Sequence, residues 1–139
     1  MTKARKTLSD EDYRSLAEFR YLVRQFLAFS EDAARDAGLA AKQHQALLAI
    51  KGFGGCLTVG ELAEKLIIQP HSAVGLVDRL VNAELVRRRP RKGDRRQVEL
   101  TLTVMGEKTL ASLSKTHRDE LRRLMPLFRQ TLRIWDSDA

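Results

Sequence analysis

Residues 57–84 read LTVGELAEKLIIQPHSAVGLVDRLVNAE, and this stretch decides the fold. Thr58 followed by Glu61 is a capping box at the start of one helix, and Pro70 suits the first position of a second. Only residues 67–69 separate the two expected helices. Apolar residues of the second helix recur at helical spacing: Ala73, Leu76, Val77 and Leu80. Two short helices joined by so tight a turn predict a helix-turn-helix.

The hydrophobic period then changes from about 3.6 residues to about 2, which is typical of strands. Residues 85–90, LVRRRP, and 97–103, QVELTLT, flank a turn, RKGD, with Gly93 at the bend. Apolar residues of the second strand alternate with polar ones and are expected to face the core: Val98, Leu100 and Leu102. The sequence therefore predicts a β-hairpin directly after the helix-turn-helix.

Helical segments flank this region on both sides. Ser9 and Asp12 predict a capped start for a helix that runs to Gly38, with apolar residues on more than one face. A second helix, about 41–53, is expected to turn three apolar residues inward: Leu47, Leu48 and Ile50.

The chain is expected to end in two helices. Thr103 caps the first, which runs to about Met125, and Pro126 is expected to end it. The last helix aligns four residues on one face: Phe128, Thr131, Leu132 and Trp135.

Positive charge is concentrated on the hairpin. Residues 87–96, RRRPRKGDRR, hold seven basic side chains and one acidic one, which gives +6 of the formal net charge of +7. Because cations that neutralise phosphates release counterions, this placement favours DNA as a partner. Asp94 lies two residues before Arg96 on an extended strand, so it can hold that guanidinium for entry into a minor groove. The alternatives are a solvated charged face and a casual surface ion pair.

Other chemistry is not expected. The three histidines, His44, His71 and His117, lack ligand spacing, so neither a metal site nor a cofactor is predicted. No nucleophile has an identifiable base, so no catalytic residues and no enzyme activity are expected. The single Cys56 rules out a disulfide framework and suits a reducing compartment. With neither a secretory signal nor an apolar run of bilayer length, we expect a cytoplasmic protein without a membrane partner.

The order of these segments resembles the MarR family of winged-helix transcription regulators. LTVGELAEKL and LVDRLVNAELVRRR are similar to the DNA-reading helices of that family, and GDRRQVELTLTVMG is similar to its wing. The pattern D-x-R, then L-T-x-x-G, falls on five residues: Asp94, Arg96, Leu102, Thr103 and Gly106. The chain departs from the pattern at Ile67, where the family often has Gly, and at Pro70, Val74 and Gly75, where polar or basic residues often begin the recognition helix.

The resemblance implies an α+β, mainly α fold: a winged helix-turn-helix domain with N- and C-terminal dimerisation helices. A single MarR-like chain, 1–139, would hold a helical dimerisation region, 9–37 and 104–136, and a DNA-binding region, 41–103. The apolar surface of the first and last helices independently favours a homodimer. A twofold dimer would set its recognition helices about 34 Å apart, which matches double-stranded DNA with a palindromic operator.

By the same resemblance, the helix from Pro70 lies in the major groove. His71 and Ser72 could then reach base edges or phosphate, and Val74 could contact a thymine methyl. Arg79 would face the DNA backbone or brace the hairpin. The implied DNA-binding residues are Gln69, Pro70, His71, Ser72, Val74, Gly75, Arg79, Arg89, Arg91, Lys92, Asp94, Arg95 and Arg96.

Family members commonly release DNA when a small aromatic or anionic effector binds. The resemblance implies an effector site at Phe19, Arg20, Arg24, Phe26, His44 and Trp135, although aromatic residues at helical spacing are more often plain core. The expected function is therefore a ligand-responsive repressor. The alternatives are an architectural DNA-binding protein without sequence preference and a winged-helix protein-interaction module.

Overall fold

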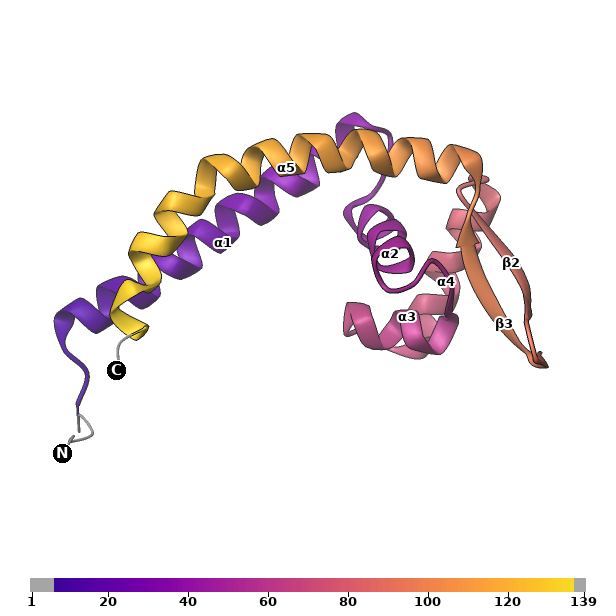
Figure 1. Ribbon diagram of the computed structural model, residues 1–139, viewed down its shortest axis with the longest axis horizontal. Coiled ribbons are helices and arrows are strands. Elements are labelled where there is room, and N and C mark those ends of the chain that lie inside the picture. Colours follow the sequence, from indigo (N-terminus) through magenta and orange to yellow (C-terminus); the bar gives the residue numbers. More distant parts are fainter. Residues whose placement is uncertain (1–6, 137–139) are drawn as a thin grey trace. The chain divides into compact units, whose positions relative to one another are not determined.

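The computed structural model describes residues 7–136, which form five α-helices, three β-strands and one short 3-10 helix (Figure 1). The helices are α1 (Asp10–Asp36), α2 (Ala41–Gly52), α3 (Val59–Leu66), α4 (Pro70–Asn82), α5 (Val104–Leu132) and the 3-10 helix η1 (Arg133–Trp135). The strands are β1 (Leu57–Thr58), β2 (Val86–Arg91) and β3 (Asp94–Leu102). The chain divides into two compact units, one within residues 1–30 and 116–139, the other Glu31–Lys115.

The second unit contains the predicted helix-turn-helix, α3–α4, and the predicted hairpin, β2–β3. Its three strands form an antiparallel sheet in the order β1-β3-β2, so β3 is the central strand. Leu57 of β1 pairs with Leu100, and Val86 of β2 pairs with Leu102. The expected fold class, mainly helical with a small sheet and a winged helix-turn-helix, is confirmed.

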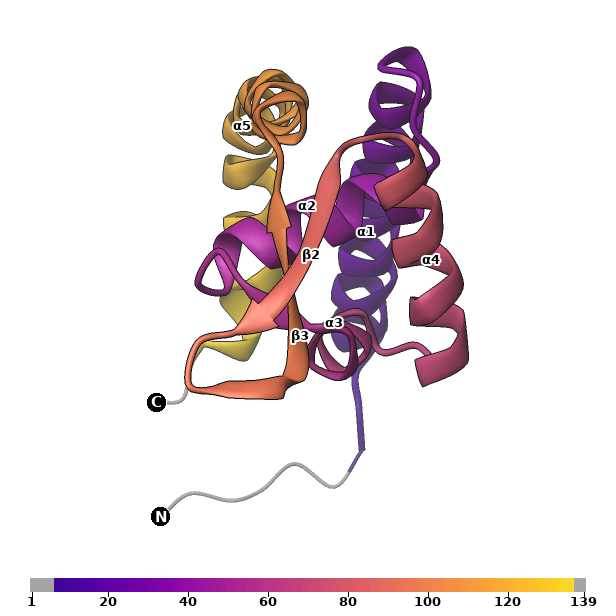
Figure 2. The same ribbon diagram turned by 90° about the vertical axis from the view of Figure 1, so that its right-hand side faces the viewer.

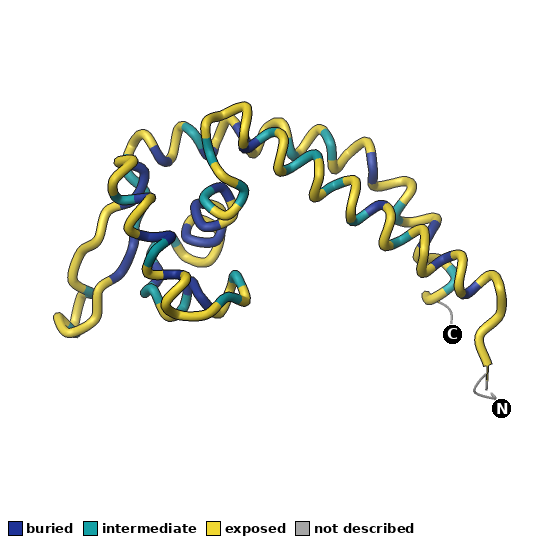
Figure 3. The backbone as a smooth tube through the Cα atoms, turned by 180° about the vertical axis from the view of Figure 1, so that it is seen from behind, coloured by how far each residue is buried: buried dark blue, intermediate teal, exposed yellow. Residues whose placement is uncertain are grey.

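A single apolar core holds the second unit together. It is built from residues of α2, α3, α4 and the hairpin base, and its fully buried members include Leu47, Ile50, Leu62, Leu80 and Leu100. Burial of one such side chain stabilises the folded state by about 1.5–3 kcal/mol. Figure 3 shows buried residues along α2–α4 and mostly exposed ones along the hairpin. The helix-turn-helix therefore belongs to the buried core, and most of the hairpin lies outside it.

Both predicted capping boxes form. The Ser9 backbone N–H donates to Asp12 Oδ2 at 2.9 Å, and the Asp12 N–H donates to Ser9 Oγ at 3.1 Å. At the start of α3, the Thr58 N–H donates to Glu61 Oε1 at 2.9 Å and the Glu61 N–H donates to Thr58 Oγ1 at 3.1 Å. Pro70 occupies the first turn of α4, where its missing N–H costs no intrahelical hydrogen bond.

In the first unit α1 and α5 pack antiparallel. Ser15 Oγ donates to the Thr131 carbonyl at 2.6 Å, and the Phe19 and Phe128 rings meet edge to face at 5.9 Å. Ser15 therefore lies beside Thr131, and Phe19, one turn later in α1, lies beside the earlier Phe128 of α5. The two helices thus run in opposite directions. The Trp135 indole N–H donates to Ser15 Oγ at 2.8 Å, which fastens η1 to the helix pair.

The predicted break at Pro126 is wrong, because α5 continues through Pro126 to Leu132. A proline inside a helix costs about 3 kcal/mol, since it lacks the N–H and crowds the preceding turn. Packing on either side opposes this cost: Leu124 is fully buried, and Phe128 contacts Phe19. Tertiary contacts therefore override the local signal.

Two further burial predictions are wrong. Leu48 is half exposed, because it lies about 100° around α2 from the buried Leu47. Val98 is also exposed, since it lies towards the hairpin tip, beyond the apolar core. Its neighbour Glu99, expected to face solvent, is instead only 6% exposed.

Candidate nucleic-acid interface

Helix α4 has one face in the core and one in solvent. Ala73, Leu76, Val77 and Leu80 are buried, as predicted from their spacing. On the other side lie exposed members of the predicted DNA-binding set: Gln69, Pro70, His71, Ser72 and Val74. The Gln69 side chain makes no capping hydrogen bond with the helix it precedes. The exposed face at the N-terminus of α4 thus offers an amide, an imidazole, a hydroxyl and an isopropyl group.

Further along α4, two charged side chains lie close to other groups. Asp78 forms an ion pair with Arg88 of β2, so an acid of α4 braces the hairpin. The Arg79 guanidinium folds back over Gly75, where a Cβ would lie 3.7 Å from Arg79 Nη1. The contact between α4 and the hairpin therefore comes from Asp78, not from Arg79, which is exposed on α4.

The hairpin changes register near its tip. Arg91 pairs with Asp94 across the turn Lys92-Gly93, whereas Pro90 pairs with Val98. Three residues of β3 therefore lie between two successive paired positions of β2, and we call them the hairpin bulge: Arg95, Arg96 and Gln97. Figure 2 shows the two strands spreading apart there. Pro90 lies beside this bulge on the edge strand β2, and an edge strand tolerates a residue that has no N–H to donate.

The hairpin bulge displays a guanidinium held by an acid. The Arg96 backbone N–H donates to Asp94 Oδ1 at 3.1 Å, and Arg96 Nε donates to the same oxygen at 3.3 Å. The Arg96 side chain is nevertheless 91% exposed. The predicted contact between Asp94 and Arg96 is thus confirmed, and it leaves the guanidinium facing solvent.

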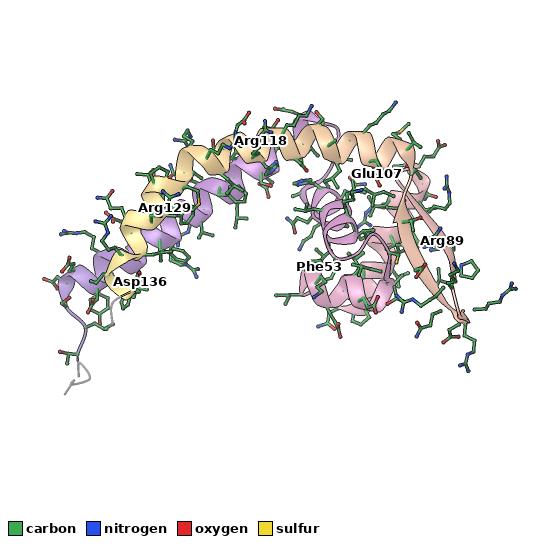
Figure 4. The ribbon with its side chains drawn as sticks, in the orientation of Figure 1. Phe53, Arg89, Glu107, Arg118, Arg129 and Asp136 are labelled. Carbon is green, nitrogen blue, oxygen red and sulfur yellow. The ribbon has the colours of Figure 1, made fainter. Side chains whose placement is uncertain are left out.

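Arg91, in contrast, is turned into the protein. Its Nε donates to Glu99 Oε2 at 3.1 Å, its Nη1 to Gln97 Oε1 at 3.0 Å and its Nη2 to Glu61 Oε1 at 3.0 Å. Arg89, labelled on the hairpin in Figure 4, lies 3.5 Å from the other Glu99 oxygen. Sequence reasoning missed three functional candidates: Glu61, Gln97 and Glu99. It missed Glu99 because the bulge moves this residue opposite Arg89.

These contacts shift two acid–base equilibria. The Glu61 pKa lies below its usual value, first because the Thr58 backbone N–H donates to the carboxylate and second because Arg91 does. The pKa of Arg91 is raised, chiefly by its hydrogen bond to Glu99 and then by that to Glu61. Both groups are therefore held in their charged forms.

The predicted effector residues occur in both units. Phe19, Arg20, Arg24, Phe26 and Trp135 lie in the first unit, and His44 is buried on α2 in the second. The ring of Phe26 contacts His117 edge to face at 5.8 Å. Arg20 and Arg24 are exposed on α1. The aromatic members therefore have packing partners within the helix pair.

Within residues 7–136, no group of three or more His, Cys, Asp or Glu side chains is arranged to hold a metal ion. Each helix in the same range is too short or too polar to cross a membrane.

Comparisons with known proteins agree with this geometry. Residues 37–97 match the sequence model of the MarR family. AbsC of Streptomyces coelicolor, a MarR family transcriptional regulator, has a similar structure with a TM-score of 0.72 and 20% identity, covering 92% of this chain and 93% of that one. RV1404 of Mycobacterium tuberculosis gives a TM-score of 0.71 at 26% identity, with 87% and 82% covered.

A third similar structure is a MepR mutant of S. aureus bound to an oligodeoxyribonucleotide. Its TM-score is 0.65 at 19% identity, and 82% of each chain is covered. No curated protein sequence matches this chain significantly. The resemblance predicted from the sequence is thus confirmed: residues 37–97 match the MarR family model, and the chain has the winged-helix fold of that family's transcription regulators.

Proposed function

We propose that this chain binds double-stranded DNA through α4 and the hairpin and thereby regulates transcription. The observation that carries the proposal is the hairpin bulge, which displays Arg95 and Arg96 on the same unit as the exposed face of α4. Cations on a projecting hairpin suit a phosphate backbone and a narrow minor groove. The MarR-family fold and the DNA-bound MepR neighbour support this assignment.

In this proposal each exposed group has a separate task. The N-terminal face of α4 lies in the major groove, where His71 and Ser72 reach base edges or phosphate and Val74 contacts a thymine methyl. Arg96, oriented by Asp94, enters the minor groove beside it. Lys92 and Arg95 contact phosphates and so contribute affinity without sequence information.

The protein is proposed to act as a homodimer. The helices of the first unit leave large apolar side chains exposed, among them Tyr13, Leu16, Tyr21, Leu27, Leu121 and Leu127. A second copy could cover this surface with the same residues of its own, as a twofold interface requires. Such a dimer would read a palindromic operator.

The regulation proposed is repression that a small aromatic or anionic effector relieves, in a cytoplasmic protein that is not an enzyme. An open surface cavity of about 570 Å³ offers a site for such a ligand. Its lining combines Trp135 with two guanidinium groups, those of Arg129 and Arg133, and also includes Leu132 and Asp136 (Figure 4 labels Arg129 and Asp136). An indole ring beside arginines suits an aromatic carboxylate by stacking and by charge.

The first experiment compares binding to the promoter DNA beside the protein's own gene with binding to a random duplex of equal length, across a salt series. We expect selective binding that persists at physiological salt, by a dimer that light scattering detects. Equal binding to both duplexes, lost together as salt rises, would indicate an architectural protein. An intact dimer without duplex affinity at low salt would indicate a protein-interaction module.

A further inference from the structure

The seven basic side chains of residues 87–96 are not equivalent. Arg96 is 91% exposed, whereas Arg91 is 28% exposed and each of its three guanidinium nitrogens donates to a different protein acceptor. We propose that Arg91 is a positioning residue of the DNA-binding hairpin, which clamps the hairpin bulge to helix α3. The proposal rests on the proposed function and assigns Arg91 a task other than binding phosphate.

The clamp joins three separate parts of the chain. Glu99 lies on β3 beyond the hairpin bulge, Gln97 lies within the bulge, and Glu61 lies in the first turn of α3. A bulge interrupts the regular ladder of hydrogen bonds, so its direction needs another support. Arg91 supplies that support by hydrogen-bonding the bulge and the helix with one planar group.

The burial of Glu99 favours its pairing with Arg91. Glu99 is 6% exposed, and a carboxylate so far removed from water is stable only when it is paired and hydrogen-bonded. Its two oxygens face Arg89 at 3.5 Å and Arg91 at 3.1 Å. A phosphate that recruited Arg91 would have to break these contacts and leave Glu99 without its closer partner. Arg91 is therefore better placed to hold the bulge than to bind a phosphate.

An unusual charge dependence follows. Glu61 and Glu99 are acids beside a polyanion, so simple electrostatics predicts that their neutralisation tightens DNA binding. If they fix the bulge through Arg91, their neutralisation lets Arg95 and Arg96 move away from the DNA, and binding weakens. The sign of the effect separates the two accounts.

The test measures promoter DNA affinity of Glu61→Gln and Glu99→Gln at fixed salt. Glutamine is itself a capping-box residue, so Glu61→Gln keeps the α3 cap while removing the charge that faces Arg91. The matched control is Glu107→Gln, at the start of α5 (labelled in Figure 4), which removes the same charge. Glu107 forms an exposed ion pair with Lys51. We expect about threefold to thirtyfold weaker binding for the first two and less than about twofold change for the control.

A double-mutant cycle assigns the effect to Arg91. In an Arg91→Met background, Glu61→Gln should have almost no further effect, because its partner is already absent. Lys92→Met removes one charge from the same turn and should lower the salt slope by about 0.9, as a phosphate contact does. Tighter binding of both glutamine variants, or a change no larger than that of the control, would overturn the clamp. Additive effects in the cycle would overturn it as well.

Amide hydrogen exchange of the free protein decides the matter even if no duplex binds. Arg91→Met and Glu99→Gln should speed exchange at residues 95–97, whereas Lys92→Met should not. Exchange on α2 should stay as in the unchanged protein, which shows that the variants fold. Unaltered exchange at the hairpin bulge would overturn the clamp, while faster exchange without any DNA binding would keep the clamp and reject the proposed function.

Discussion

The base and the tip of the hairpin are built on opposite principles. At the base, Val86 and Leu100 are buried, and the ladder is regular from Val86–Leu102 to Pro90–Val98. The Thr103 hydroxyl donates to the Glu84 carbonyl at 2.6 Å, and a side chain at Gly106 would collide with the Leu85 carbonyl. At the tip the ladder shifts register, and charged contacts take the place of apolar ones.

This difference separates stability from function along one strand pair. The base contributes its free energy by burial, which does not depend on the orientation of any single charged group. The tip buries little apolar surface, so its geometry depends on a few hydrogen bonds between charged side chains. Substitutions at the base should therefore change folding first, and substitutions at the tip should change DNA binding first.

The largest effect is expected from Leu100→Ala at the base. Leu100 is fully buried on the central strand, so its truncation leaves a cavity among α2, α3 and the hairpin. The free energy of unfolding should fall by about 2–5 kcal/mol, as measured by urea denaturation. The tip control, Arg95→Ala, should change it by less than about 0.5 kcal/mol. Equal losses from both would show that base and tip form one cooperative unit.

Next in size is Arg96→Ala at the tip, which should weaken operator binding by about 1–3 kcal/mol. The exposed guanidinium makes no apolar contact that folding needs, so the urea midpoint should stay unchanged. A fluorescence anisotropy titration at fixed salt measures the loss. An unchanged dissociation constant would remove Arg96 from the proposed interface.

Asp94→Ala sharpens the same comparison, because it raises the net charge yet releases Arg96. Since both the Arg96 backbone N–H and its Nε use Asp94 Oδ1, the guanidinium loses its fixed direction. Binding should weaken by about 1 kcal/mol in the same titration. Tighter binding would mean that Arg96 acts only through its charge.

Much of the base could be predicted from the sequence, and less of the tip. The capping boxes, the buried stripe of α4 and the contact between Asp94 and Arg96 are local, so residue types at fixed spacing reveal them. The partners of Arg91 depend on a register shift of three residues, which the sequence marks only by Pro90. Counting outward from the turn would place Arg96, not Glu99, opposite Arg89.

The Pro126 prediction was wrong for a related reason. Its local cost is real, but Leu124 and Phe128 pack well enough to keep α5 continuous. The DNA-binding and effector residues remain predictions, because the contacts that would test them involve other molecules. Sequence therefore predicts structure best where the deciding contacts are a few residues apart.

Ile67→Gly should act in the opposite direction, by raising stability. The tip turn has Gly93 at φ +90°, whereas the turn of the helix-turn-helix has Ile67 at φ +56°, a left-handed conformation that strains a branched side chain. Ile67 is 90% exposed, so little burial is lost. The free energy of unfolding should rise by about 0.5–1 kcal/mol in urea denaturation. Ile67→Ala, which keeps the strain, should show no such gain.

The smallest effect concerns acid and the clamp at Glu61. Because the folded-state pKa of Glu61 lies below its usual 4.5, its contribution to stability is complete above that value and is lost as pH falls through the folded pKa. The Glu61 side chain is 43% exposed, so solvent screens this contribution. Urea midpoints measured from pH 6 down to about pH 3 should fall less steeply for Glu61→Gln than for the unchanged protein. Parallel curves would mean that the charge of Glu61 adds nothing to folding, and that any effect of Glu61→Gln on DNA binding arises from the position of the hairpin alone.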